Sequence, residues 1–165
     1  MHREYENIDA RYFNLPLDEK SPAAQFRYVY PFNFTTVAQA WILKFNYEPR
    51  FVLTSFANVQ QLDEDRVQFY RRVDCAAGDD LSYEKIIINR ADKTITSELI
   101  AEGFNKKEQV CERSILHPEG EDKVVQDYTL IAHQGVKTVK LELFKTGIER
   151  LYKTVKFAQF EQQSE

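Results

Sequence analysis

Arg71 is the residue whose type and position could do chemistry. It lies in the segment 66–75, where apolar and polar residues alternate as in a half-buried strand. The apolar residues that share one face of this segment are Val67, Phe69, Val73 and Cys75. Arg71 falls on the same face, and an arginine directed at a core is costly unless it is paired.

Three outcomes are open for Arg71. It could line a cavity and bind an anionic head group such as a phosphate. It could form an internal salt bridge, for instance with Glu98 or Glu112. It could also turn outward at a bulge, because inward-pointing charges are among the devices that protect sheets.

The other reactive residue types form no catalytic or metal-binding pattern. The three histidines, His2, His117 and His133, are scattered, and the acidic residues gather in turn-like segments. Cys75 and Cys111 are far apart and neither belongs to a CxxC pair, which argues against a zinc site. We expect both cysteines to be reduced. We also expect no enzymatic activity, no metal and no cofactor.

The segment 135–162 has the period of a long amphipathic helix. Its apolar face is formed by Leu141, Phe144, Ile148, Leu151, Tyr152 and Val155. Between residues 135 and 159 its charged residues are Lys137, Lys140, Lys145, Arg150, Lys153 and Lys156, with Glu142 and Glu149. Lys145 and Lys156 flank the apolar face, and Arg150 and Lys153 are expected on the far face. Gly147 predicts close packing or a kink.

This basic helix has two interpretations. It could rest on anionic lipid head groups or on an acidic partner protein. The alternative is a solvated outer face with pairs such as Glu149–Lys153.

Seven strands and a short helix are expected ahead of this long helix. The expected strands are 26–34, 51–62, 66–75, 81–89, 94–102, 108–116 and 123–133. The short helix follows the first strand, is capped by Thr35 or Thr36 and ends before Pro49. Pro31 should place the first strand at a sheet edge or break it.

A long amphipathic helix that follows an antiparallel meander buries its apolar face most readily in the concave face of the sheet. The sequence therefore predicts an α+β helix-grip fold, in which a curved seven-stranded antiparallel sheet clasps a long C-terminal helix. Such a fold encloses a cavity where the lining side chains do not fill it, and cavities of this kind suit apolar ligands. The residues expected to line the cavity are Phe69, Val73, Leu141, Phe144, Ile148, Leu151 and Val155.

The chain has 165 residues, which suits one domain. We expect an N-terminal extension at 1–25 and the helix-grip domain at 26–162. The net charge of −4 argues against a general nucleic-acid binder. No apolar run reaches the length of a membrane span, and the first residues are too acidic for a cleaved presequence.

Several short motifs carry a resemblance to a known family. The segment 41–49, Trp-Ile-Leu-Lys-Phe-Asn-Tyr-Glu-Pro, is followed by Val-Leu-Thr at 52–54. Arg71-Arg72, Val-Cys-Glu-Arg at 110–113 and, more weakly, Phe144-Lys145 complete the pattern. These motifs resemble the PRELI-like family of intermembrane-space lipid-transfer proteins, which are relatives of the START-type helix-grip domains.

The resemblance implies a START-like fold and a non-enzymatic carrier. Such a carrier binds acidic phospholipid, such as phosphatidic acid or phosphatidylserine, and transfers it between mitochondrial membranes. It implies a location in the intermembrane space or at the inner membrane, without a cleaved presequence. Carriers of this family often act with a small disulfide-rich partner.

We select three head-group candidates by face and position, namely Arg71, Lys137 and Lys140. The expected partners are phospholipid, an anionic membrane surface, and proteins that contact residues 1–25 and the basic C-terminal helix. We expect no nucleic acid. One alternative is a structural or accessory subunit of a mitochondrial membrane protein complex that keeps the fold without transferring lipid. A third is an enzyme of the aromatase/cyclase type.

Overall fold

The computed structural model of the chain describes residues 24–46, 51–75, 81–100, 110–130 and 137–164. Within these residues, two helices and seven strands follow one another in the predicted order. The elements are β1 (Ala24–Tyr30), α1 (Phe34–Leu43), β2 (Phe51–Gln61), β3 (Arg66–Cys75), β4 (Leu81–Asn89), β5 (Thr94–Ile100), β6 (Val110–Pro118), β7 (Val124–Leu130) and α2 (Lys137–Ser164).

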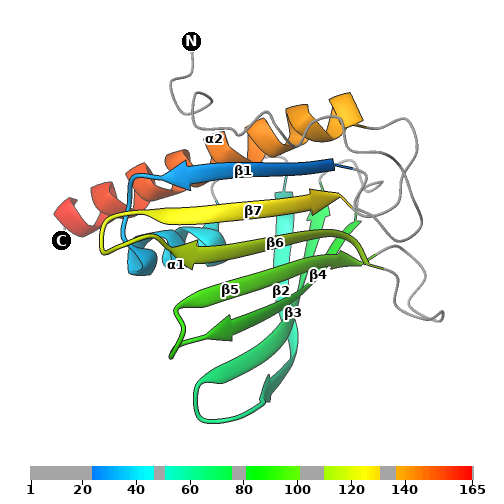
Figure 1. Cartoon of the computed structure of the whole chain (residues 1–165), viewed down its shortest axis with the longest axis horizontal. Coiled ribbons are helices and arrows are strands. Elements are labelled where there is room, and N and C mark those ends of the chain that lie inside the picture. Colours follow the sequence, from blue (N-terminus) through cyan, green and yellow to red (C-terminus); the bar gives the residue numbers. More distant parts are fainter. Residues whose placement is uncertain (1–23, 47–50, 76–80, 101–109, 131–136, 165) are drawn as a thin grey trace.

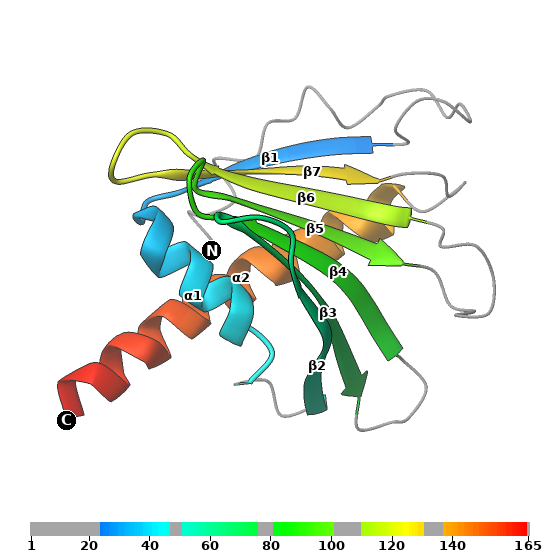
Figure 2. The same ribbon diagram turned by 90° about the horizontal axis from the view of Figure 1, so that it is seen from below.

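The seven strands form one antiparallel sheet in the order β1-β7-β6-β5-β4-β3-β2, with β1 and β2 at its edges (Figure 1). The sheet is curved, and both helices lie on its concave side (Figure 2). The predicted α+β fold, a curved seven-stranded sheet that clasps a C-terminal helix, is therefore confirmed.

The boundaries around α1 differ from the prediction. β1 ends at Tyr30, directly before Pro31, at an edge of the sheet. The predicted caps Thr35 and Thr36 are wrong, because the N-cap is Asn33. Asn33 has an extended backbone, and its side-chain oxygen accepts a hydrogen bond of 2.8 Å from the backbone N–H of Thr36. The helix therefore begins within the segment that the alternation had assigned to the first strand.

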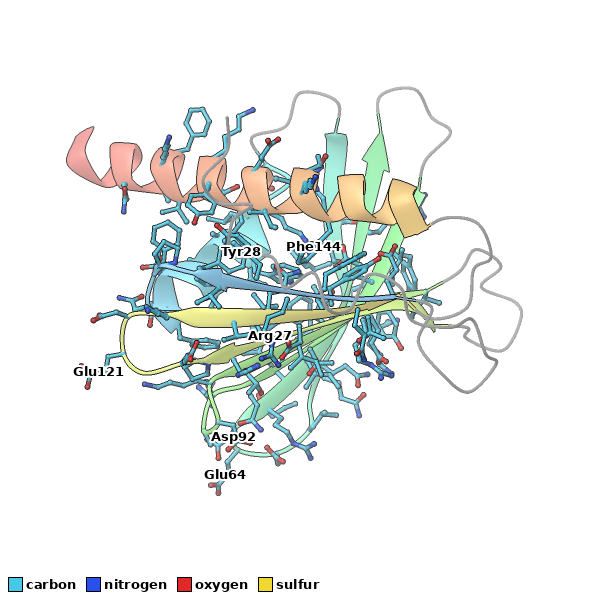
Figure 3. All side chains as sticks on the ribbon, turned by 45° about the horizontal axis from the view of Figure 1, so that its top comes forward. Arg27, Tyr28, Glu64, Asp92, Glu121 and Phe144 are labelled. Atoms are coloured by element: carbon cyan, nitrogen blue, oxygen red, sulfur yellow. The ribbon has the colours of Figure 1, made fainter. Side chains whose placement is uncertain are left out.

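α2 packs its apolar face against β1, β7 and α1. Phe144, Ile148, Leu151 and Val155 are at most 5% exposed and belong to the same core cluster as Phe26, Tyr28 and Tyr128. Tyr28 and Phe144 lie between α2 and the sheet, whereas Arg27 points to the other face (Figure 3). The buried face of α2 that the helical period predicted is therefore confirmed.

Gly147 departs from the expectation of close packing. A Cβ atom added at this position would meet no atom within 4 Å. The prediction that a close approach required glycine here is therefore wrong.

The cysteines lie on strands that are not neighbours. Cys75 is on β3 and Cys111 on β6, with β4 and β5 between them. Three strand spacings amount to about 14 Å along a sheet, and a disulfide needs Cα atoms closer than about 7 Å. The backbone therefore excludes a disulfide between Cys75 and Cys111 within one chain.

Among the described helices, none has the length and apolar character needed to cross a membrane. Residues 1–23, which make up most of the predicted N-terminal extension, lie outside the described residues.

Candidate functional site

The interior near β1 and β7 is filled with aromatic side chains. Phe26 stacks on Tyr128 and on Phe144, with ring centroids 5.6 and 5.5 Å apart. The Tyr28 and Tyr152 rings meet edge to face, and their hydroxyls share a hydrogen bond of 2.7 Å. Aromatic packing of this kind adds to the burial energy and leaves little free volume.

The buried polar groups in this part of the interior have partners. Tyr30 is fully buried and donates a hydrogen bond of 2.7 Å to Gln126, which in turn donates one of 3.1 Å to Ser114. Burial raises the pKa of the Tyr30 hydroxyl well above its ordinary value. Tyr30 is therefore a neutral donor at every physiological pH.

The predicted cavity-lining residues are buried where the structure describes them. Phe144, Ile148, Leu151 and Val155 are buried in the core, Val73 is fully buried, and Phe69 is 9% exposed. The side chain of Leu141 lies outside the described residues. Whether these residues line a ligand cavity stays a prediction.

Arg71 faces the concave side, as the alternation predicted, and is fully buried. It lies directly opposite Glu84 in the β3–β4 register, and its Nη2 donates to both Glu84 carboxylate oxygens at 3.1 and 3.3 Å. Its Nη1 donates to the backbone carbonyls of Trp41 at 2.7 Å and Ile42 at 3.3 Å. These carbonyls lie at the C-terminal end of α1, where the helix dipole favours a cation.

The internal salt bridge therefore exists, but its suggested partners are wrong. Glu98 instead pairs with Arg113 at 2.8 Å and with Lys85 at 3.8 Å. Glu84 was missed because local sequence does not give the register between β3 and β4.

Glu84 is held as a carboxylate. Burial by itself raises the pKa of Glu84, but the charges of Arg71 and Lys44 outweigh burial. Hydrogen bonds from Arg71 and from the Ser97 hydroxyl, the latter 2.7 Å long, add to their effect and hold the pKa at about 2. Glu84 is thus a fixed negative charge at neutral pH.

Lys44 completes the site, and it was not among the site residues predicted from the sequence. It is 8% exposed, and its ammonium lies 3.5 Å from the centroid of the Trp41 ring, a cation–π contact. Burial is the largest cause that lowers the pKa of Lys44, from 10.5 to about 7. A lysine at the end of an apolar helical stripe was the signal available in the sequence.

Three cations converge on the ring of Phe45. Lys44 Nζ, Arg71 Cζ and Arg150 Cζ lie 5.0, 4.7 and 5.1 Å from its centroid. We call these three residues, together with Phe45 and Glu84, the Phe45 cluster. The expectation that Arg150 lies on the far face of its helix is therefore wrong, because its guanidinium reaches Phe45, which is 7% exposed.

Within the described residues, one donor of the Arg71 side chain and one of the Trp41 side chain have no hydrogen-bond partner. They are the Nε atom of Arg71 and the Nε1 atom of Trp41, and both are buried. A buried N–H without an acceptor is costly, so such a group in a native structure calls for an explanation. Together with the neighbouring side chains of Lys44 and Arg71, these donors suit an anion that accepts hydrogen bonds.

The two other predicted head-group residues, Lys137 and Lys140, lie in the first turn of α2, and their side chains are outside the described residues. Their place beside Arg71 at a head-group site therefore stays a prediction. Within the described residues, no group of three or more His, Cys, Asp or Glu side chains is arranged to hold a metal ion.

Solved structures resemble this chain in fold. Human STARD10 matches with a TM-score of 0.49 and 12% identity, over 85% of this chain and 66% of that chain. The lipid transfer and protein localization domain of human StarD13 matches with a TM-score of 0.49 and 10% identity, over 80% and 76%. The di-domain ARO/CYC StfQ from the steffimycin biosynthetic pathway matches with a TM-score of 0.51 and 9% identity, over 86% and 52%. The chain thus spans about half the length of StfQ and two thirds of STARD10.

The strand order, the position of α2 and the match to StfQ define the fold as a START-like helix grip. No protein-family model and no curated protein sequence matches the chain. The narrower PRELI-like assignment is therefore not confirmed, and these likenesses concern the fold alone.

Proposed function

We propose that the protein binds an acidic phospholipid between α2 and the concave face of the sheet and transfers it between membranes without catalysis. The observation that carries the proposal is the Phe45 cluster, a buried site with three basic side chains and one buried carboxylate. Beside it, Arg71 Nε and Trp41 Nε1 are donors that lack an acceptor. A phosphate oxygen would supply that acceptor, and acyl chains would enter between α2 and the sheet by displacing side chains that pack there.

The mitochondrial location, in the intermembrane space or at the inner membrane, is part of this proposal. It is supported by the resemblance of segments 41–49 and 110–113 to PRELI-like proteins. Solved structures of similar fold include the lipid transfer domain of human StarD13 and human StAR-related lipid transfer protein 5, which agrees with carriage of lipid in general.

A carrier is favoured over an enzyme by the state of Glu84. A carboxylate whose pKa is about 2 is a weak base at neutral pH, and Arg71 holds it in place. The description of StfQ as ARO/CYC makes the enzyme alternative testable, since turnover that depends on Arg71 or on His133 would support it.

The outer part of α2 suits contact with an anionic membrane. Lys153 and Lys156 are exposed, and Phe157 beside them is 41% exposed. A basic helix with an exposed aromatic residue binds anionic lipid surfaces, and salt weakens this attraction. Charge reversal by K153E and K156E is expected to lower binding to anionic vesicles at low salt. Equal binding by this variant and the wild type would contradict the membrane contact.

A lipid-transfer assay tests the proposed function. The double variant R71M/E84Q removes both charges of the buried pair and avoids leaving Glu84 alone. Because charge-assisted hydrogen bonds contribute about 1.5–3 kcal/mol, we expect the transfer rate of acidic phospholipid between vesicles to fall about tenfold or more.

The matched control is R27M/D127N, which removes a pair on the other face of the sheet whose side chains are 42% and 35% exposed. We expect this control to change the rate by less than about twofold, because exposed pairs contribute little. Equal rates for the two double variants would refute a head-group role for Arg71.

The second candidate is a structural subunit of a mitochondrial membrane complex. The observation that favours it is the aromatic filling near β1, where Phe26, Tyr128 and Phe144 stack on one another. A stable complex with other subunits that contains no lipid would support this candidate. A co-purified phospholipid on the isolated chain would argue against it.

A further inference from the structure

The charged groups that act on Lys44 come from four elements packed around the end of α1. Arg71 lies on β3, Glu84 on β4, Glu112 on β6 and Arg150 on α2. Arg71 and Glu84 hold each other at 3.1 Å. The carboxylate nearest to the buried cations is therefore already engaged, and Lys44 lies on the face of the Trp41 ring.

These surroundings favour the uncharged amine of Lys44 when no ligand is bound. Lys44 is almost fully buried, and two guanidinium groups share the Phe45 ring with it. Burial and the two arginines lower the pKa of Lys44 to about 7, although Glu84 and Glu112 oppose them. Above pH 7 the amine is therefore mostly neutral, which is unusual for lysine.

An anion at this site would reverse the preference. A negative charge within a few ångströms of the amine favours the ammonium, which has three donors to offer. We propose that a phosphate-type oxyanion binds beside Lys44, Arg71 and Trp41, and that Lys44 takes up one proton from solvent as the anion binds. If the anion is a lipid head group, the inference rests on the proposed function. A free oxyanion would bind to the same donors by the same chemistry.

The consequence is an affinity that depends on pH. Below pH 7 Lys44 is already charged, so binding requires no proton. Above pH 7 each binding event must also protonate the amine, so the affinity falls tenfold for each pH unit. Between pH 6 and pH 8 we therefore expect a loss of about tenfold.

The experiment is isothermal titration calorimetry of the full chain with dihexanoyl phosphatidylglycerol. Its phosphodiester does not titrate between pH 6 and 8, so the head group adds no protons of its own. Measurements in buffers of different ionisation enthalpy count the protons taken up. We expect almost one proton at pH 8 and almost none at pH 6.

Two variants isolate Lys44. Lys44→Met cannot be charged, so its affinity should be weak at both pH values without proton uptake. Lys44→Arg is always charged, so its affinity should be strong at both pH values, also without uptake. Lys123→Met, at an exposed position in the β6–β7 turn, should keep the wild-type pH dependence.

A parallel titration with sulfate separates the two sources of the anion. Sulfate binding with the same proton uptake supports an oxyanion site that does not need acyl chains, and binding of the lipid alone supports a lipid head group. Lipid binding without proton uptake would overturn this inference and leave the proposed function intact. Failure of both probes to bind the folded chain would overturn both.

Discussion

At the scale of single residues, the burial of Arg71 requires compensation. Its guanidinium is fully buried, and its charge is compensated by Glu84 and by the carbonyls at the end of α1. Buried ion pairs contribute little to stability relative to apolar residues, because desolvation cancels most of their attraction. The pair is therefore compatible with a role other than stability, and binding of an anion is the role that we propose for it.

The cost of breaking the pair is the first prediction. Arg71→Met removes the guanidinium that pairs with the buried Glu84 carboxylate, so it should lower the free energy of unfolding by about 3–5 kcal/mol at pH 7. The double variant R71M/E84Q should recover most of this loss, because no uncompensated charge is left.

Urea denaturation measures both values. Arg27→Met provides the comparison on the other face of the sheet, where we expect a change of about 0–1 kcal/mol. If Arg71→Met were no more destabilising than Arg27→Met, the interpretation of Arg71 as a buried, paired charge would be wrong.

The pH dependence of stability at Lys44 is the second prediction. Its pKa is about 7 in the folded chain and 10.5 in the unfolded chain, so the unfolded state binds more protons between these values. The wild type should therefore gain stability as the pH rises from 7 to 10.5.

Lys44→Met lacks this dependence and should be more stable than the wild type by about 1–4 kcal/mol at pH 7. The difference should shrink towards pH 10.5, and urea titrations of both proteins across this range measure it. A difference that stays constant with pH would show that Lys44 is not the titrating group.

At the scale of elements, α1 and α2 bring the cations together. α1 has 10 residues, too few to be stable in isolation, and is held by packing against α2 and the sheet. Its C-terminal end supplies Trp41 and Lys44, while α2 supplies Arg150. The geometry of the Phe45 cluster thus depends on where α1 ends relative to β3.

Gly147 allows a test of α2 itself. An alanine methyl group at this position meets no atom within 4 Å, and alanine favours a helix over glycine. Gly147→Ala should therefore stabilise the fold by about 1 kcal/mol, measured as a shift of the urea midpoint. Destabilisation would restore the hypothesis of a close approach at this glycine.

The element order was predictable because strand alternation, turn residues and the helical period are local signals. The same signals placed Arg71, Ile148 and Leu151 inside. Glu84 could not be assigned to the site, because it meets Arg71 only through the register between β3 and β4. Lys44 could not be assigned either, because it comes near Arg71 only where the end of α1 packs on the sheet. Arg150 was misplaced because its guanidinium lies against Phe45, and the helical period does not show that this residue packs there.

At the scale of the whole molecule, the sheet and α2 form a grip whose described interior has two unlike parts. Near β1 and β7 it is packed with aromatic rings, and near β3, β4 and the end of α1 it holds the Phe45 cluster. A structural subunit requires only the first part. A lipid carrier uses the second part for the head group, so the cluster is the feature that separates the two functions.

The most direct test is native mass spectrometry of the full chain after incubation with phosphatidylcholine vesicles that contain phosphatidic acid and phosphatidylglycerol. We predict a one-to-one adduct with an acidic phospholipid on the wild type and on R27M/D127N, and its loss on R71M/E84Q. A folded wild-type chain that leaves these vesicles without bound lipid, or that binds phosphatidylcholine equally well, would contradict the account.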